Sequence, residues 1–235
     1  MRRPEPRLVV SCEHAGNRVP PRYRALFRGA AAELRSHRGW DPGALDLARA
    51  IAFACNAPLL ANTTSRLVVE CNRSPGHSQL FSAFTRDLDP AEQFRLLALF
   101  YHPHRRDVEV SLRRAMRRRR AVHIGVHTFT PVLNGKRRRT DIGLLFDPKR
   151  RFEGEVVEAL SRELRTRAPK LRVRRNYPYR GWTDGLTTTL RGRFPAASYA
   201  GIEFEVNQAL LRNPVGWKQV TTAIADAVRR ALETL

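Results

Sequence analysis

The stretch Leu8-Val9-Val10-Ser11-Cys12 is the first apolar run of the chain, and Glu13-His14-Ala15-Gly16-Asn17 follows it at once. A run of strand-forming residues that stops at small residues and Asn indicates a buried strand that ends in a tight loop. His14 then lies just beyond the carboxyl end of a strand, the edge at which open α/β sheets bind ligands. We therefore predict that His14 is the first ligand of a catalytic zinc ion. The alternative for a single histidine is an ordinary loop residue.

Strand-like and helix-like segments alternate along the rest of the chain. Apolar runs predict further strands over residues 59–61, 66–71, 121–126, 142–146, 171–174 and 199–206. Helical periodicity predicts helices over residues 21–35, 45–54, 90–101, 107–120, 156–167 and 215–235, with Pro103 interrupting the chain between the third and the fourth. This alternation predicts an α/β fold with a mainly parallel sheet that helices cover on both faces. No repeat or linker stands out, so we expect one domain over residues 1–235.

The composition is that of a globular protein. The chain has 235 residues, of which 42% are hydrophobic and 28% charged, enough for one substantial core. No apolar stretch approaches the roughly 20 residues that a membrane span needs, and the polar start, residues 1–7, shows no secretory signal. We therefore expect a cytoplasmic protein. Its three cysteines, Cys12, Cys55 and Cys71, lack the spacing of a disulfide framework or a thiolate zinc site, and we expect them in the core.

The formal net charge of +21 would suit a nucleic-acid-binding protein. However, only four of the 43 basic residues are lysines, and the arginines are spread along the whole chain, which indicates a general composition bias. Two clusters, residues 113–120 and 136–139, have no RNA-recognition motif or interleaved aromatic residues beside them. We expect no nucleic acid as the main partner and predict that the basic surface attracts anionic substrates. A homo-oligomer is compatible with this composition.

Polar residues that could hold a metal follow two of the predicted strands. His127 comes directly after the strand over residues 121–126, as His14 comes after the first strand. Asp41 precedes Pro42 and a predicted helix, so a helix N-cap is the alternative to a role at the metal. A hydrolytic zinc site takes about three histidine or carboxylate ligands and a water molecule. Two histidines and one carboxylate would provide that set, although no motif places two of them on one helix.

Other polar residues fit the chemistry of hydrolysis. Glu203 and Glu205 share one face of the strand over residues 199–206, because side chains alternate along a strand. One of them can move a proton from water to a leaving nitrogen, and pairing with arginines is the alternative for both. Arg73 presents a planar fork for a carboxylate, and Asn72 can add a donor. This pair predicts an acidic substrate.

Several segments together resemble the N-formylglutamate amidohydrolase family. They are Ser11-Cys12-Glu13-His14-Ala15-Gly16-Asn17, Trp40-Asp41-Pro42-Gly43-Ala44, Val126-His127-Thr128-Phe129-Thr130-Pro131, Asp141-Ile142-Gly143-Leu144-Leu145-Phe146-Asp147, and Asn176-Tyr177-Pro178-Tyr179 with Gly185. The family is similar to the zinc carboxypeptidases and aspartoacylases. The resemblance implies a three-layer α/β sandwich with a mainly parallel mixed sheet and one zinc ion (Zn²⁺) at its carboxyl edge.

The resemblance also implies roles for single residues. The segments around His14 and His127 are similar to those that supply the two zinc histidines. The segment Phe204-Glu205-Val206-Asn207 is similar to the strand with the general base, which favours Glu205 over Glu203. The segment Val69-Glu70-Cys71-Asn72-Arg73 is similar to the strand whose Asn-Arg pair holds the substrate carboxylate.

One position departs from the pattern of the wider fold. The peptidases have a glutamate ligand three residues after the first zinc histidine, and this chain has Asn17 there. The third zinc ligand is therefore open, with Asp41 as our first choice and Glu13 as the second.

The implied activity is hydrolysis of a formamide, or another short N-acyl amide, on an acidic amino acid such as N-formylglutamate. Such a small anionic substrate would release formate and a free amine, a step of histidine catabolism. The loop with Tyr179 would close over it. One alternative is a zinc hydrolase of the same fold that acts on a peptide or a cell-wall-derived amide. Another is a non-enzymatic basic binding protein on a vestigial hydrolase fold.

Overall fold

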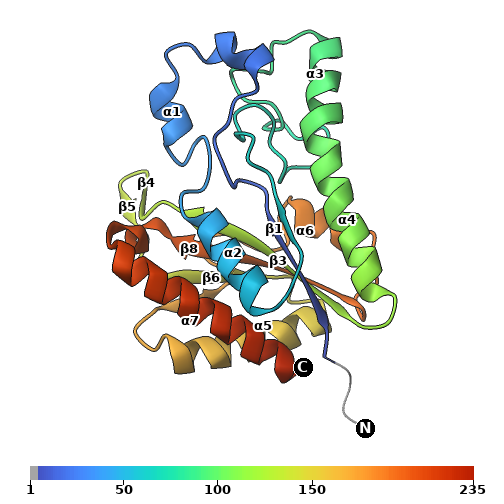
Figure 1. Cartoon of the computed structure of the whole chain (residues 1–235), viewed down its shortest axis with the longest axis vertical. Coiled ribbons are helices and arrows are strands. Elements are labelled where there is room, and N and C mark those ends of the chain that lie inside the picture. Colours follow the sequence, from blue (N-terminus) through green and yellow to red (C-terminus); the bar gives the residue numbers. More distant parts are fainter. Residues whose placement is uncertain (1–4) are drawn as a thin grey trace.

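The computed structural model describes residues 5–235, so part of the polar start, residues 1–4, lies outside it. One six-stranded sheet organises these residues (Figure 1). Its strands, in spatial order, are β2 (Leu59–Ala61), β1 (Arg7–Cys12), β3 (Ala121–Phe129), β8 (Tyr199–Asn207), β6 (Ile142–Leu145) and β7 (Val173–Arg175). Only the pairing of β6 with β8 is antiparallel in this sheet. The predicted α/β fold with a mainly parallel, mixed sheet is confirmed.

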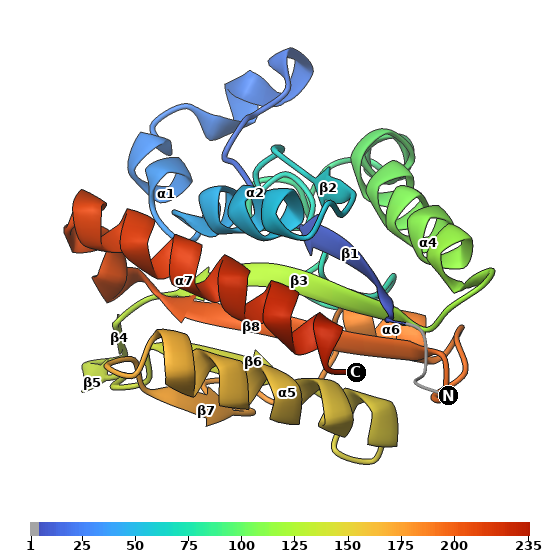
Figure 2. The ribbon, with the colours of Figure 1, turned by 60° about the horizontal axis from the view of Figure 1, so that its bottom comes forward.

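Helices cover both faces of the sheet. On one face lie α2 (Ala44–Ala54), α5 (Arg151–Arg167) and α7 (Pro214–Glu233) (Figure 2). Helix α7 packs against both α2 and α5, and all three contribute side chains to the core above the strands. The other face is covered by α4 (His102–Met116) and the short α6 (Leu186–Arg191). The three layers form because each helix has an apolar stripe that it buries against the sheet.

The two faces of the central strands differ in chemistry. In β3, Val122, Ile124 and Val126 point into the large core beneath α2, α5 and α7. Because side chains alternate, His123 and His127 point to the opposite face. There the ring of His123 accepts or donates hydrogen bonds with the hydroxyl groups of Ser11 (2.8 Å) and Tyr199 (3.0 Å). One face of the central strands is therefore apolar, and the other carries polar groups beside a smaller apolar cluster.

Residues 66–71 do not form the strand that their apolar run predicts. They follow a series of turns in which Val68 N donates to Ser65 O and Glu70 N donates to Leu80 O. Val68 and Val69 are still fully buried, beneath the segments before and after them. A short apolar run indicates that residues are buried, but it does not specify the backbone conformation. The predicted strand over residues 66–71 is therefore wrong, although the predicted burial is right.

The two helices predicted around Pro103 are one continuous rod. It consists of α3 (Pro90–Leu96), the π-helical turn η2 (Leu97–Tyr101) and α4. Proline lacks an N–H group and its ring crowds the carbonyl four residues earlier, and the wider π turn before it accommodates both effects. Pro103 therefore changes the pitch of the helix without ending it.

The remaining elements are short. The predicted helix over residues 21–35 is a 3₁₀ helix, η1 (Pro21–Phe27), followed by α1 (Ala31–Arg35), and Gly29 at φ 81° separates them. The second basic cluster begins in a small hairpin of β4 (Val132–Leu133) and β5 (Lys136–Arg137), and η3 (Gln208–Arg212) precedes α7. Within residues 5–235 no helix combines the length and apolar character that crossing a membrane requires.

Gly143 allows the loop after β7 to lie directly on β6. A Cβ atom at this position would lie 1.9 Å from the carbonyl oxygen of Tyr177. We expect Gly143→Ala to lower the free energy of unfolding by ~1–3 kcal/mol, because the strand or the loop must move. Thermal and urea denaturation measure this loss.

Gly154 is the matched control. It lies inside α5, and apart from its chain neighbours and the adjacent backbone of its own helix, no atom of residues 5–235 lies within 4 Å of the position of an added Cβ. Gly154→Ala should stabilise the protein by ~0.5–1 kcal/mol, because alanine loses less entropy in a helix. If both variants changed stability equally, the close approach at Gly143 would not constrain the fold.

Candidate active site

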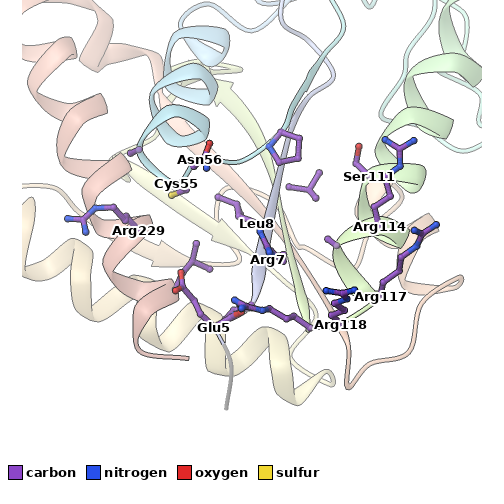
Figure 3. A pocket seen from close by; sticks show the side chains of 17 residues that line it. Glu5, Arg7, Leu8, Cys55, Asn56, Ser111, Arg114, Arg117, Arg118 and Arg229 are labelled. Carbon is purple, nitrogen blue, oxygen red and sulfur yellow. The ribbon is translucent and has the colours of Figure 1, made fainter. Parts of the chain in front are cut away.

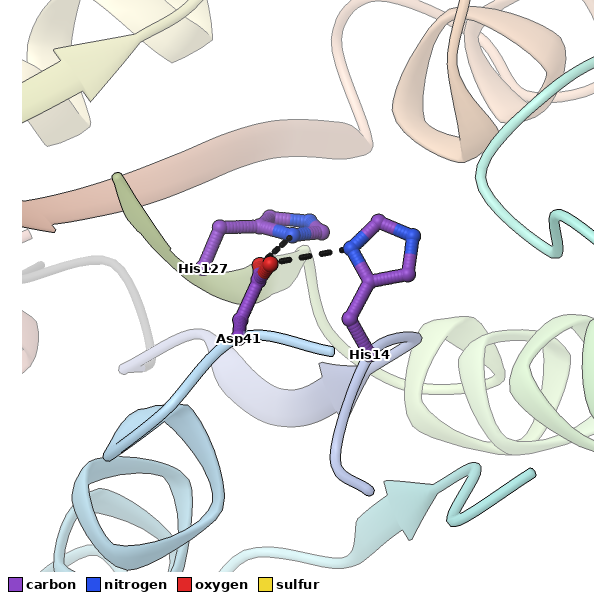
Figure 4. A group of neighbouring side chains, drawn as sticks. All are labelled: His14, Asp41 and His127. Carbon is purple, nitrogen blue, oxygen red and sulfur yellow. Dashed lines mark hydrogen bonds and ion pairs between the residues drawn. The ribbon is translucent and has the colours of Figure 1, made fainter. Parts of the chain in front are cut away.

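His14, Asp41 and His127 meet at the carboxyl edge of the sheet (Figure 4). His14 follows β1, His127 is part of β3, and Asp41 lies in the loop before α2. Oδ2 of Asp41 is 3.3 Å from Nδ1 of His14 and 3.1 Å from Nδ1 of His127. All three residues are buried, and the possible ligand atoms lie within 4.8 Å of one another. This group could hold a metal ion.

Asp41 is not the N-cap of α2. The N-cap position is Gly43, at φ 81°, and no side chain in the described part of the chain caps the helix. The backbone carbonyl of Asp41 accepts from Ala44 N, while its carboxylate points away from the helix to the two histidines. Of the two interpretations of Asp41, the structure therefore favours a place at the histidines.

A second layer of carboxylates surrounds the histidines. Oε1 of Glu70 is 2.5 Å from Nε2 of His14, and the other oxygen of Glu70 accepts from Arg66 at 2.7 Å. Oε2 of Glu13 is 3.2 Å from Nε2 of His127, an ion-pair distance without the alignment of a hydrogen bond. Glu13 thus lies behind His127, and not with the Nδ1 atoms where Asp41 lies. A carboxylate at the far nitrogen of a histidine leaves Nδ1 free to bind a metal.

Charge compensation in this cluster shifts its pKa values. Burial alone would raise the pKa of Asp41, yet His14, His127 and Arg66 hold it well below its usual range. Burial would lower the pKa of His127, but Asp41 and Glu13 raise it well above its usual range. Buried carboxylates thus require positive charge nearby. A divalent cation among the Nδ1 atoms would supply that charge and fits the chemistry of the donor set.

A cavity of about 200 Å³ adjoins this cluster. Glu205, opposite His127 in the pairing of β8 with β3, is 7% exposed. Its Oε2 has no hydrogen-bond partner among residues 5–235, and burial raises its pKa to about 8. Oε1 of Glu203, which also lines the cavity, accepts from the hydroxyl group of Thr187 at 3.0 Å. Glu205 is thus the glutamate with an unengaged oxygen.

The predicted substrate-binding residues line the same cavity. They are Asn72, Arg73 and Tyr179. One guanidinium nitrogen of Arg73 donates to the carbonyl of Asp184 at 2.8 Å, and the carboxamide oxygen of Asn72 accepts from Leu186 N at 2.7 Å. The remaining guanidinium N–H groups of Arg73 and the side-chain NH₂ group of Asn72 can therefore still donate to a ligand.

Tyr179 lies at the exposed side of the cavity. Its side chain is 45% exposed, and its hydroxyl oxygen accepts from Arg138 at 3.2 Å. The guanidinium of Arg138 stacks between the rings of Tyr179 and Phe129, 5.3 and 5.5 Å from their centroids. Arg138 therefore connects this loop to the end of β3.

Comparison with known proteins identifies the family. A sequence model described as N-formylglutamate amidohydrolase matches residues 6–212. The chain belongs to the N-formylglutamate amidohydrolase family. The resemblance seen in the sequence is thereby confirmed, and so is membership in a family of amidohydrolases.

Solved structures support the same fold. The chain is similar to a crystal structure of a gene product from Agrobacterium tumefaciens, with 30% identity, a TM-score of 0.80, and coverage of 97% of this chain and 90% of that one. It is also similar to the N-formylglutamate amidohydrolase from Ralstonia eutropha, with 20% identity, a TM-score of 0.72, and coverage of 99% and 94%. No curated protein matches the sequence.

Several residues that contact the predicted site residues could not be identified from the sequence. Glu70 belongs to the segment over residues 66–71, which the sequence predicts as a strand. A strand at that place gives no reason to expect Glu70 beside His14. Arg66, four residues earlier, could have indicated a local ion pair. His104 and Arg138 had no sequence signal, because only the tertiary fold brings them to Glu13 and Tyr179.

Glu205 should make the metal-free protein less stable as the pH rises. With a pKa of about 8 in the folded chain and roughly 4.3 when unfolded, it binds more protons when folded, so stability falls as pH increases between these values. We expect Glu205→Gln, which removes this charge, to unfold at a higher temperature than the wild type at pH 7.5 in a chelator. The gain should be on the order of 1 kcal/mol or more and should shrink as the pH falls toward 5.

Glu203→Gln is the control. Its carboxylate already accepts a hydrogen bond from Thr187, so this substitution should not stabilise the protein. A Glu205→Gln protein that is less stable than the wild type at pH 7.5 would contradict the assignment of a buried, uncompensated carboxyl group.

Proposed function

We propose that the chain is a zinc-dependent amidohydrolase that removes a formyl or other short acyl group from an acidic amino acid such as N-formylglutamate. The observation that carries this proposal is the buried group of His14, Asp41 and His127 beside the unengaged oxygen of Glu205. Family membership supports hydrolysis of an amide bond.

The metal would be held by His14, Asp41 and His127. Two imidazole nitrogens and one carboxylate oxygen form a donor set that zinc prefers at hydrolytic sites, where a further position is left open. When bound there, a zinc ion supplies Lewis acidity toward the amide carbonyl and toward water. The carboxylates of Glu70 and Glu13 orient the two imidazole rings from behind.

Glu205 would move the protons of the reaction. Its carboxylate takes one proton from the attacking water and delivers it to the leaving nitrogen, so the amide C–N bond breaks and formate and a free amine are released. Its burial keeps bulk water from competing for the proton. A cation beside it lowers its pKa from the value of about 8, which makes the carboxylate available at neutral pH.

Arg73 and Asn72 would select an acidic substrate. The guanidinium fork and the amide N–H groups can bind one carboxylate at the side of the cavity. A cavity of about 200 Å³ suits a single N-acyl amino acid better than a peptide. Tyr179 at the exposed side would cover the bound substrate.

A substrate panel tests the proposed function. N-formylglutamate, N-acetylglutamate, a neutral N-formyl amide and short peptide amides are incubated with the protein, with and without a chelator. We expect release of formate from N-formylglutamate, loss of this activity in the chelator, and recovery on addition of zinc.

Other results of the panel would replace the proposal. Cleavage of peptide amides alone would indicate a hydrolase for peptides or cell-wall fragments. No cleavage of any amide, together with salt-sensitive binding to polyanions, would indicate a basic binding protein.

Arg73→Ala tests the selection of acidic substrates. Loss of a charged, bidentate contact should raise KM for N-formylglutamate by ~10- to 100-fold and leave the neutral N-formyl amide almost unchanged. Arg180→Ala, on the exposed part of the loop with Tyr179, is the control and should change neither constant. Equal losses for both substrates in Arg73→Ala would exclude a role in carboxylate binding.

A further inference from the structure

His104 lies behind the site on a different element from any predicted ligand. It belongs to α4, and its side chain is only 7% exposed. Nε2 of His104 is 3.2 Å from Oε1 of Glu13, whose other oxygen faces Nε2 of His127 at 3.2 Å. The chain His104–Glu13–His127 therefore connects a helix on the surface of the sheet to the candidate metal site.

Glu13 depends on both histidines. Its side chain is 1% exposed, and a buried carboxylate is strongly destabilising unless positive groups or donors pair with it. Each of its oxygens has one histidine within 3.2 Å. Loss of His104 would leave one oxygen uncompensated, and the carboxylate could then turn away from His127.

The π turn before Pro103 places His104 in this position. One extra residue in the turn shifts the register of the side chains that follow it by about 100° relative to a regular α-helix. His104 faces the sheet, whereas His102 of the same turn is exposed. The interruption of the helix at residues 97–101 thus coincides with a buried polar contact at the site.

We propose that His104 is a positioning residue that acts through Glu13 to hold the His127 ring in the orientation that binds the metal. This inference rests on the proposed zinc site. Second-layer partners of this type typically change metal affinity by ~10- to 100-fold.

Zinc affinity, measured by competition with a chromophoric chelator, tests the inference. We expect His104→Ala to weaken zinc binding at least tenfold, and His104→Gln, whose amide N–H can reach Glu13, to restore most of it. His102→Ala, on the same helical turn, should stay within twofold of the wild type. Thermal denaturation of the metal-free variants shows that each one is folded.

A double-mutant cycle separates this inference from a general structural effect. If His104 acts through Glu13, the Glu13→Gln/His104→Ala protein should bind zinc no more weakly than Glu13→Gln alone. Additive losses, or equal affinities of His104→Ala and His102→Ala, would overturn the inference while leaving the zinc site intact. A wild-type protein that binds no zinc would overturn the proposed function and this inference together.

A second, independent feature is a cavity of about 890 Å³ at the amino end of β1 (Figure 3). The candidate site lies beyond the carboxyl end of the same strand. Its apolar wall includes Leu8, Val9 and Leu232. The charged residues that line it are one glutamate, Glu5, and six arginines: Arg7, Arg114, Arg117, Arg118, Arg119 and Arg229.

Four of these arginines lack a compensating partner among the residues that the structure describes. Within residues 5–235, the guanidinium groups of Arg7, Arg114, Arg117 and Arg118 form no ion pair or hydrogen bond, whereas Arg229 pairs with Asp226. Like charges around a concave surface repel one another and raise the local positive potential. An anion with several charged oxygens would relieve this repulsion, and guanidinium groups bind phosphate oxygens in pairs.

We infer that this cavity binds an anion with several phosphate groups. Titrations with inorganic tripolyphosphate and with ATP at 150 mM salt test the inference and distinguish an inorganic from a nucleotide source. We expect saturable binding of one molecule, with at least tenfold weaker binding by Arg114→Glu/Arg118→Glu.

The control variant, Arg24→Glu/Arg28→Glu, makes the same change in net charge at two exposed arginines of η1 and its cap that line no part of this cavity. It should bind within twofold of the wild type. Equal weakening in both variants would mean that net charge alone attracts phosphate, and non-saturable binding by the wild type would also overturn the inference.

Discussion

Buried charge at the carboxyl ends of β1 and β3 is the constraint on which the rest of the structure depends. Three carboxylates, from Glu13, Asp41 and Glu70, lie within a few ångströms of two histidines, and all are almost inaccessible to water. A carboxylate that is buried away from water cannot remain ionised without positive charge or hydrogen-bond donors beside it. The segments that deliver positive charge must therefore stay close to these strands.

This requirement explains several irregular elements. The turns over residues 66–71 bring Arg66 and Glu70 together beside His14, which an extended strand would not do, because residues four apart lie far from each other along a strand. The π turn before α4 directs His104 to Glu13. In both places, regular secondary structure is interrupted where a buried carboxylate, Glu70 or Glu13, pairs with a basic side chain.

The sheet separates stability from chemistry. Its face toward α2, α5 and α7 holds a large cluster of buried hydrophobic side chains, which can stabilise the fold independently of the site. The opposite face carries His123, His127, Glu203 and Glu205. His123 hydrogen-bonds with Ser11 and Tyr199, and burial lowers its pKa to about 4, so its ring is neutral. His123 therefore has a structural role in the buried layer on this face of the sheet, and both its ring nitrogens are already engaged.

The sequence predicted the fold class and several of the residues that line the cavity. His14, His127 and Glu205 follow or belong to strands whose apolar runs are clear, and parallel strands bring their carboxyl ends together. Asp41 was ambiguous because Asp before Pro also begins helices. Glu70, His104 and Arg138 could not be found, because each acts on a residue that only the tertiary fold brings near. The geometry of residues 66–71 was equally hidden, since an apolar run reports burial alone.

The central claim is that His14, Asp41 and His127 share one divalent cation. Elemental analysis of the purified protein, beside a His127→Ala protein of similar thermal stability, tests it most directly. We expect about one zinc ion per chain in the wild type and almost none in the variant. An equal metal content in the two proteins, or no metal in a wild type that has been dialysed against zinc, would contradict it.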